Sequence, residues 1–344
     1  MSSITSPRQE TPPGLRLAIA ALKTQAQQIG RLVGEVEALC APHALADPDS
    51  PVLAEIMRRN VPRWHFAMLN DAERNTALTE ALRRRIPPGS VVLDIGAGTG
   101  LLAMAAVRAG AAHVYTCEEN PLLAEIARQT IAGHGMSDAV TVLGKRSTEL
   151  EVGRDLERRV DVLVSEIVDC GLIGEGLLPS VRDARARLLA PGGLMMPVAA
   201  RLYGQLIESE TVVGLNRVTG AGGFDVSLMN TAATRGHFPV RLGTWPHRAL
   251  TEPRELVAFD LASGELGPGS RTLPFTATAD GEAHALVTWF AMDLGGGITL
   301  RNAPQNTASH WMQALLLLDK PLALSAGQST DIELSWTDTT LAVS

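Results

Sequence analysis

The spacing of hydrophobic and polar residues changes along the chain, and the central stretch is the most regular. Between residues 91 and 190, short apolar runs alternate with segments in which apolar residues recur three and four positions apart. The first pattern is typical of buried strands and the second of amphipathic helices. Such alternation indicates an open parallel sheet with helices on both faces. The predicted strands lie at 91–95, 113–117, 140–143 and 160–165, and the predicted helices at 101–109, 121–133 and 180–190.

The C-terminal part of the chain has a different texture. From residue 199 onward, short runs such as ELVAFDLA and STDIELSW are separated by Gly and Pro turns, and apolar and polar residues alternate within them. This pattern predicts an antiparallel β-sandwich or β-barrel. The apolar run 314–318 fits one of its buried strands. Residues 214–243 fit the alternation poorly, so we expect an inserted loop or arm there.

The N-terminal part is predicted to be helical after a polar start. We expect residues 1–13 to be disordered, because they are polar and contain prolines. Helical spacing over 15–40 predicts one or two helices, and it resumes over 53–85. The resulting divisions are a tail with a helical extension at 1–50, an α/β domain at 51–197 and a β domain at 198–344.

Composition narrows the classes of function. Hydrophobic residues make up 45% of the 344 residues, which is enough for a sizeable core. The net charge of −7 argues against binding of nucleic acid or anionic membranes and favours a cationic substrate. The sequence has neither a secretory signal pattern nor an apolar stretch of eighteen residues. Cys40, Cys117 and Cys170 form no disulfide framework, so we expect a reduced, cytoplasmic protein.

A glycine-rich turn, DIGAGTG, follows the first predicted strand and begins at Asp94. Gly96, Gly98 and Gly100 would let the backbone turn tightly and approach a ligand closely. Taken alone, this spacing also suits an ordinary strand-to-helix turn. Glu118 ends the next strand, where an acid can accept both hydroxyls of a ribose. Because the spacing differs from that of dinucleotide-binding turns, an adenosyl group without a pyrophosphate is favoured, and S-adenosylmethionine fits best.

Two glutamates bracket the loop that follows the strand at 160–165. Glu166 and Glu175 are nine positions apart, and the residues between them are partly apolar. Carboxylates in such a loop are costly unless they meet a cation. A guanidinium has a planar fork of five donors, which two carboxylates can grip from two edges. The alternative is that both glutamates are exposed loop residues, and the spacing alone leaves both interpretations open.

Two further segments carry candidate chemistry. His310 lies within Ser309-His310-Trp311 at the start of a predicted strand, and a lone histidine of this kind is more often structural. In the segment HFAMLNDAER, residues 65–74, Asp71 and Arg74 share one helix face. An ordinary surface ion pair is the alternative for these two residues.

Together and in this order, the four segments resemble those of the protein arginine methyltransferases. The Glu166–Glu175 loop with its LIGEG segment is most similar to the monomethylating, type III-like branch. HFAMLNDAER resembles the family's MLxDxxR helix, and SHW resembles its THW loop with Ser in place of Thr. The resemblance runs from about residue 60 to the C-terminus. Trp64 departs from the family's usual N-terminal stretch, and the chain has one catalytic module where animal members of this branch have two.

The resemblance implies a Rossmann-like methyltransferase domain at 51–197, a β-barrel substrate domain at 198–344 and a homodimer formed through an arm, for which 214–243 is the candidate. It implies catalytic roles for Glu166 and Glu175 and a proton-accepting pair of His310 and Asp71, without a metal. The substrate would also contact Met68 and Trp311. The implied cofactor-binding residues are His65, Arg74, Asp94, Gly96, Gly98, Gly100, Glu118, Arg146 and Ser147.

The expected activity is therefore methyl transfer from S-adenosylmethionine to a guanidino nitrogen, ending at monomethylarginine. We favour free L-arginine or another small guanidino metabolite as the substrate, because the chain has a single module and no added peptide-binding domain. Arginyl residues of polypeptides are the alternative substrate. A non-catalytic dimeric scaffold of the same fold is the alternative function. Neither nucleic acid nor a membrane is expected as a partner.

Overall fold

The computed structural model describes residues 13–39 and 51–344. The chain divides into two compact units, Met1–Arg63 and Trp64–Ser344. In the first unit, α1 (Pro13–Leu39) is a single continuous helix, so the N-terminal pattern forms one helix rather than two, and α2 (Pro51–Asn60) follows it. The predictions for residues 1–12 and for Cys40 lie outside the described residues.

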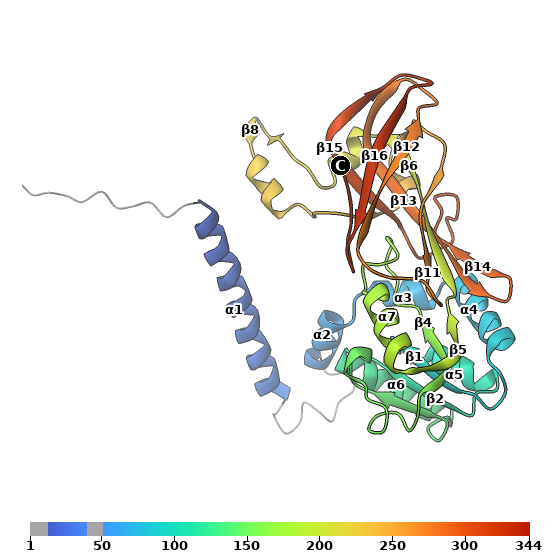
Figure 1. Cartoon of the computed structure of the whole chain (residues 1–344). Coiled ribbons are helices and arrows are strands. Elements are labelled where there is room, and N and C mark those ends of the chain that lie inside the picture. Colours follow the sequence, from blue (N-terminus) through green and yellow to red (C-terminus); the bar gives the residue numbers. More distant parts are fainter. Residues whose placement is uncertain (1–12, 40–50) are drawn as a thin grey trace, which may run out of the picture. The chain divides into compact units, whose positions relative to one another are not determined.

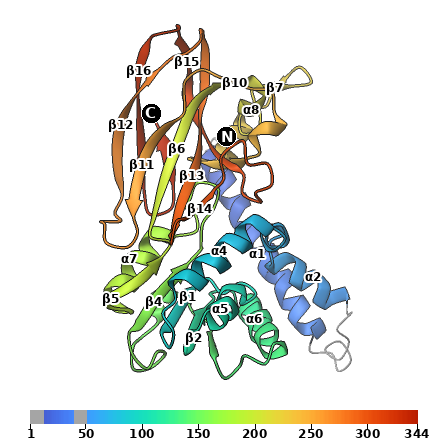
Figure 2. The same ribbon diagram turned by 90° about the vertical axis from the view of Figure 1, so that its right-hand side faces the viewer.

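A five-stranded parallel sheet forms one half of the second unit (Figure 1). The strand order is β3-β2-β1-β4-β5, so β1 and β4 are neighbours although two strands lie between them in the sequence. The strands are β1 (Val91–Ile95), β2 (His113–Cys117), β3 (Val140–Leu143), β4 (Val160–Ser165) and β5 (Leu189–Met196). The first four match the predicted strands. Figure 2 shows α5 (Leu101–Arg108) and α6 (Pro121–Gly133) on one side of this sheet and α7 (Leu177–Arg187) on the other.

The helices differ from the prediction at several boundaries. The continuous helical pattern of 53–85 is divided among α2, α3 (Trp64–Leu69) and α4 (Ala72–Arg85), and α4 is separate from α3 because Asp71 caps it through its side chain. The remaining helices are α5 (Leu101–Arg108), α6 (Pro121–Gly133), the 3₁₀ turn η1 (Ser147–Glu149) and α7 (Leu177–Arg187). The helix predicted at 180–190 therefore begins and ends three residues earlier, and its predicted last residues belong to β5.

Antiparallel strands form the other half of the second unit. A seven-stranded sheet contains β6 (Ala199–Glu208), β9 (Phe238–Val240), β10 (Arg248–Ala249), β11 (Arg254–Asp260), β13 (Gly281–Gly295), β14 (Ile298–Arg301) and β15 (Gln313–Leu324). A three-stranded sheet contains β12 (Gly269–Thr276), β16 (Ser329–Trp336) and β17 (Leu341–Val343). Among the described strands, these ladders form two packed sheets rather than one fully closed ring, in agreement with the predicted barrel-like class.

The predicted arm protrudes from this β half (Figure 1). It contains the short hairpin β7 (Gly220–Ala221) and β8 (Phe224–Asp225) and the 3₁₀ helix η2 (Ser227–Ala232), and it follows α8 (Glu210–Val213). Its predicted C-terminal limit at residue 243 is wrong, because β9 pairs with β15 at the edge of the large sheet. The protruding part therefore spans residues 214–236. Phe224, Leu228 and Met229 are exposed on it.

One hydrophobic core runs through both halves of the second unit. It joins residues of the parallel sheet, such as Val92, to residues of the β half, such as Phe290 and Leu334. Arg85 at the end of α4 adds polar links, because its Nη1 donates to the carbonyls of Met195 and Leu294. The two halves are therefore held together firmly enough to share a site.

The described residues include two of the three cysteines and all the helices that can be examined for a membrane span. Cys117 and Cys170 are free thiols and are buried. Burial raises the pKa of both, that of Cys117 to about 12. Within the ranges the structure covers, no helix has both the length and the apolar character that a membrane crossing requires.

Candidate active site

The glycine turn and the acidic loop lie side by side because they follow neighbouring parallel strands. Ile95 at the end of β1 is in register with Ser165 at the end of β4. In open α/β sheets, ligands bind at the carboxyl edge where the strand order reverses, which is this position. A Cβ added to Gly96 would lie 2.5 Å from Cγ2 of Ile167, and the φ of Gly96 is +91°. Only glycine lets the turn pass so close to the acidic loop.

Glu118 lies against the glycine turn, as the strand order leads one to expect. Its Oε2 accepts the backbone N–H of Gly98 at 3.0 Å, and its Oε1 accepts that of Asn120 at 3.0 Å. Each carboxylate oxygen can accept a second hydrogen bond. Added atoms on Gly98 would meet nothing within 4 Å. The turn therefore has the open backbone and the fixed acid that an adenosyl group with a free ribose requires.

Asp94 is buried beneath this turn. Its Oδ2 accepts the hydroxyl of Thr116 at 2.8 Å, whereas its Oδ1 is buried without a hydrogen-bond partner among the described residues. Burial, followed by the charges of Glu118 and Glu166, raises its pKa to about 7. An unsatisfied buried acceptor calls for an explanation, and a ligand that completes the site is one.

Glu166 is paired with Arg74, a contact that the sequence analysis did not anticipate. Nε of Arg74 donates to Oε1 of Glu166 at 3.1 Å, and Nη2 donates to Oε2. The two side chains are only 4% and 6% exposed, so the pair is almost fully withdrawn from water. Burial still raises the pKa of Glu166, although Arg74 opposes the shift. Glu166 thus grips one edge of a guanidinium, that of Arg74, whereas the expected grip on the substrate by Glu166 and Glu175 together stays a prediction.

Glu175 lies at the other end of the acidic loop, just before α7. It is exposed, and the structure records no ion pair for it within the described ranges. Although the residue as a whole is exposed, protein atoms surround its carboxyl group, and this desolvation, followed by the charges of Glu166, Asp169 and Glu118, raises the pKa of Glu175 to about 7. Several carboxylates thus face one another with a single buried cation among them, which favours the entry of a second cation.

Asp71 and His310 come together although 239 positions separate them. Oδ2 of Asp71 accepts both the backbone N–H of His310 at 2.8 Å and its Nδ1–H at 2.9 Å. Burial, with the nearby charges of Arg74 and Arg241, lowers the pKa of His310 despite Asp71. The ring is therefore neutral at pH 7, with its lone pair on Nε2.

Trp311 anchors the acidic loop, a role that the predicted contact with the substrate did not include. It is buried, and its Nε1 donates to the carbonyl of Val168 in the acidic loop at 3.1 Å. Asn302 makes a similar link through Nδ2 to the carbonyl of Cys170 at 3.1 Å. Arg241 supports the neighbouring loop by donating to the carbonyls of Ser309 and His310. The β half thus holds the backbone of the acidic loop.

The other predicted residues lie on surrounding elements. His65 is buried in α3, where its ring stacks on Trp64 at 3.8 Å, and Met68 is half-buried in the same helix. Arg146 is exposed after β3 and pairs with Glu119 at 2.6 Å, whereas Ser147 beside it is buried. Their roles toward a ligand stay predictions.

Sequence reasoning missed Asp169 and His237, which form a partly buried hydrogen bond between the acidic loop and the residue before β9. Asp169 lies between the two glutamates, so its position in the loop was a usable signal. For His237 the sequence offers no comparable signal, because 68 residues separate it from Asp169.

Comparisons with known proteins agree with this geometry. A family model for the arginine methyltransferase oligomerization subdomain matches residues 198–340, and one for ribosomal protein L11 methyltransferase matches residues 75–195. The arginine N(omega)-methyltransferase of Streptomyces achromogenes subsp. streptozoticus is 61% identical over 342 residues, covering 99% of this chain and 94% of that protein. The chain belongs to the arginine methyltransferase family. The predicted enzyme class and the methyl donor, S-adenosylmethionine, are thereby confirmed.

More distant relatives are longer or share mainly the fold. Protein arginine N-methyltransferase 7 of Oryza sativa subsp. indica is 35% identical over 270 residues, which cover 70% of this chain and 36% of that protein. The chain therefore spans well under half the length of that relative. The Trypanosoma brucei PRMT1 enzyme-prozyme complex with AdoHcy matches with a TM-score of 0.68 and 26% identity, covering 79% of this chain and 86% of that one. The crystal structure of PRMT6 matches with a TM-score of 0.63 and 23% identity, over 81% of this chain and 97% of the PRMT6 chain. At that identity it supports the fold alone.

Proposed function

We propose that this methyltransferase adds one methyl group to a guanidino nitrogen of free L-arginine or of a similarly small guanidino compound. The observation that carries the proposal is the grip of Glu166 on a guanidinium, that of Arg74, at the edge of the sheet beside the glycine turn. The Streptomyces relative, matched over 94% of its length, is named for arginine, which supports the small substrate. Protein arginine N-methyltransferase 7 of Oryza sativa subsp. indica and that of Drosophila ananassae are matched over only 36% and 44% of their lengths.

The residues of the glycine turn and its neighbours fit the methyl donor. S-adenosylmethionine supplies, when bound, an electrophilic methyl group. Gly96, Gly98 and Gly100 would leave room for it, Asp94 would support the turn, and Glu118 would accept its ribose hydroxyls. Arg74 would hold its carboxylate. His65, Arg146 and Ser147 complete the predicted set.

The two glutamates would orient the substrate. Glu166 and Glu175 draw positive charge toward the nitrogens that they contact, which leaves the remaining nitrogen more nucleophilic. Holding reactants in a near-attack geometry supplies up to ~7–11 kcal/mol in favourable cases. Met68 and Trp311 would line the space around this nitrogen, and Met68 would limit room for a second methyl group.

Asp71 and His310 would receive the proton that the guanidino nitrogen loses. Asp71 holds Nδ1–H of His310, so Nε2 is the nitrogen that accepts a proton. The lowered pKa of His310 keeps the ring unprotonated before the reaction. Asp71 then stabilises the imidazolium after it forms.

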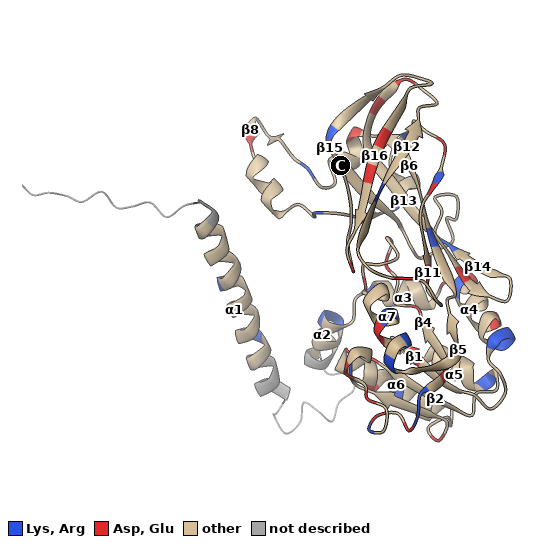
Figure 3. Cartoon of the chain, in the orientation of Figure 1, with Lys and Arg blue, Asp and Glu red and all other residues tan. Residues whose placement is uncertain are grey.

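A homodimer is part of the proposal. Phe224 is 75% exposed at the arm, and Leu228 and Met229 are exposed beside it, which supports docking of the arm on a second copy of the chain. The match of residues 198–340 to an oligomerization subdomain supports the same assembly. Figure 3 shows acidic and basic residues interspersed along the ribbon of the second unit, and the net charge of −7 favours a cationic substrate over nucleic acid.

A competition experiment tests the substrate and the product together. Free L-arginine and N-acetylarginine amide are incubated in one vessel with isotope-labelled S-adenosylmethionine, and the products are separated by mass spectrometry. Labelled monomethylarginine without dimethylarginine supports the proposal. Equal labelling of the capped compound would replace it with a polypeptide substrate, and absence of label from both, with the cofactor still bound, would favour the scaffold.

A further inference from the structure

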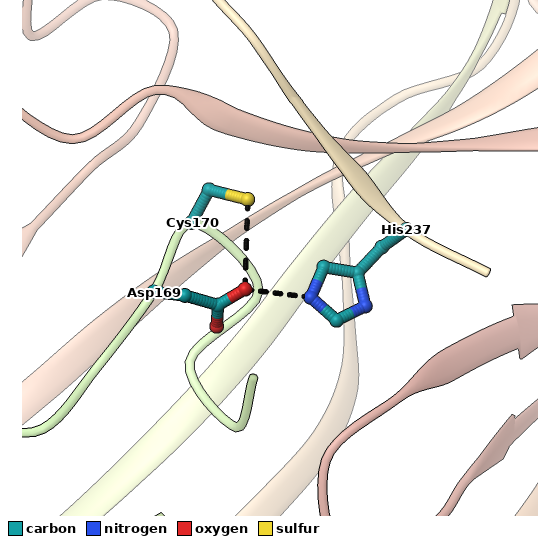
Figure 4. Close-up of side chains that lie close together, drawn as sticks. All are labelled: Asp169, Cys170 and His237. Atoms are coloured by element: carbon teal, nitrogen blue, oxygen red, sulfur yellow. Dashed lines mark hydrogen bonds and ion pairs between the residues drawn. The ribbon is translucent and has the colours of Figure 1, made fainter. Parts of the chain in front are cut away.

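Asp169 organises the loop between the two glutamates. Its Oδ1 accepts the backbone N–H of Gly174 at 2.8 Å, and its Oδ2 accepts Nε2–H of His237 at 2.7 Å (Figure 4). A Cβ on Gly171 would lie 2.5 Å from the ring of His237, and one on Gly174 would collide with the carboxylate of Asp169. The loop is therefore folded tightly around this pair, and Glu175 directly follows the residue that Asp169 holds.

The hydrogen bonds of His237 define its chemical state. Its Nδ1 accepts the backbone N–H of Leu341 at 3.1 Å, so Nε2 carries the proton that Asp169 accepts. Burial raises the pKa of Asp169, but the bonds from His237 and the loop amides outweigh it and lower the pKa overall. The pair is thus a carboxylate with a neutral imidazole.

A metal site is the other arrangement that these side chains suggest. Asp169, Cys170 and His237 offer ligand atoms within 4.8 Å of one another. Both ring nitrogens of His237 are already engaged, however, and burial raises the pKa of the Cys170 thiol, which disfavours the thiolate that binds metals. Hydrogen bonding explains the cluster without an ion.

His237 also lies at the root of the arm. It follows Gly236, whose φ is +86° and whose added Cβ would lie 2.5 Å from Thr340 and 2.7 Å from the carbonyl of Leu341. Asn216 and Thr234 close the arm's root through two hydrogen bonds of 2.8 Å. A continuous set of contacts therefore leads from the arm through His237 and Asp169 to the loop before Glu175.

The loop needs such restraint because one of its residues has an unfavourable backbone. Leu172 is fully buried and has a φ of +75°, in the left-handed region that residues with a side chain rarely adopt. A conformation of this kind persists only where the surroundings fix it.

We infer that Asp169 and His237 are a positioning pair that couples the arm to the substrate loop, so that docking of the arm holds Glu175 in the geometry that grips the guanidinium. The inference rests on the proposed function. Neither residue touches the reacting atoms in this scheme, and both act through Glu175.

The pair is tested by substitutions of His237 that keep or remove its donor. His237→Gln retains an N–H toward Asp169, and His237→Leu does not. We expect His237→Leu to raise KM for the guanidino substrate about tenfold or more, as loss of one charge-assisted hydrogen bond implies, with affinity for S-adenosylhomocysteine within twofold of the wild type. His237→Gln should recover most of the loss. His247→Leu, at an exposed histidine, is the matched control and should change neither value.

The coupling is tested by a double-variant cycle read by hydrogen exchange, which does not depend on turnover. Phe224→Asp, at the arm, and His237→Leu should each speed exchange of the amides of 169–176, and their combination should add little. Additive effects would overturn the coupling, and stoichiometric zinc in the purified protein would overturn the hydrogen-bonded pair. A wild-type protein that methylates no guanidine would refute the proposed function while leaving this cycle interpretable.

Discussion

Protonation of Glu175 is expected to control binding of the guanidino substrate near neutral pH. Its pKa is raised from 4.5 to about 7, by desolvation and by Glu166, Asp169 and Glu118. A guanidinium stays charged throughout this range, so only the carboxylate changes. With a pKa of about 7, the ionised fraction falls from about 0.9 at pH 8 to about 0.1 at pH 6, whereas an ordinary glutamate stays almost fully ionised. We therefore expect a roughly tenfold loss of arginine affinity between these pH values.

Calorimetry can measure this loss directly. L-arginine is titrated into protein saturated with S-adenosylhomocysteine, which lacks the sulfonium charge that would itself lower the pKa of Glu175. Glu175→Gln is the control, and it should bind arginine weakly and equally at pH 6 and pH 8. Asp94 also has a pKa raised to about 7, so the affinity for S-adenosylhomocysteine alone is measured at each pH to separate its contribution.

The direction of the pKa shift of Glu175 also predicts how the free energy of unfolding changes with pH. Because the folded-state pKa of Glu175 is raised, the folded protein binds more protons than the unfolded chain between pH 4.5 and about 7, and this carboxyl group lowers stability as pH rises through that window. Glu175→Gln should therefore be at least as stable as the wild type at pH 8. A wild-type affinity that changes less than twofold between pH 8 and pH 6 would refute the reasoning.

Other substitutions test separate parts of the site. Phe224→Asp should convert the proposed dimer to monomers at micromolar concentration, as measured by light scattering, and Thr231→Ala on the same arm should not. His310→Gln should lower kcat by about 10²–10⁴-fold, the usual contribution of a general base, with little change in affinity for S-adenosylhomocysteine. Trp311→Phe leaves the carbonyl of Val168 without its donor, so the free energy of unfolding measured in urea should fall by about 1–3 kcal/mol.

The parallel sheet was predictable because each of its first four strands is a short apolar run ending in a turn. Two of the errors, the end of the helix at 180–190 and the end of the arm, share a cause, since β5 contains Pro191 and β9 contains Pro239. Proline interrupts a pattern in the sequence but is tolerated where a strand lies at the edge of its sheet, as both of these strands do. Sequence spacing does not say which strands lie at an edge.

The parts of the site that depend on strand order or on the family resemblance were predictable. Glu118 and Gly98 meet because both follow adjacent parallel strands, which the alternating pattern already implies. The contact of Asp71 with His310 spans 239 positions, and only the resemblance brought the two residues together. The contact of Asp169 with His237 was missed, because it depends on how the root of the arm packs against the acidic loop.

In the proposed site, the pairing of Arg74 with Glu166 would link the methyl donor and the guanidino substrate. Removing one partner of a buried ion pair costs about 3–5 kcal/mol, because the other charge is left uncompensated. A methyl donor whose carboxylate pairs with Arg74 would leave the buried Glu166 without its cation. A guanidinium that pairs with Glu166 would likewise leave Arg74 without its carboxylate. Both ligands together satisfy both charges, so S-adenosylhomocysteine should tighten arginine binding by about 150-fold or more, the factor to which ~3 kcal/mol corresponds. Calorimetry with and without S-adenosylhomocysteine measures this factor, and equal arginine affinities would mean that Glu166 binds the substrate without leaving Arg74.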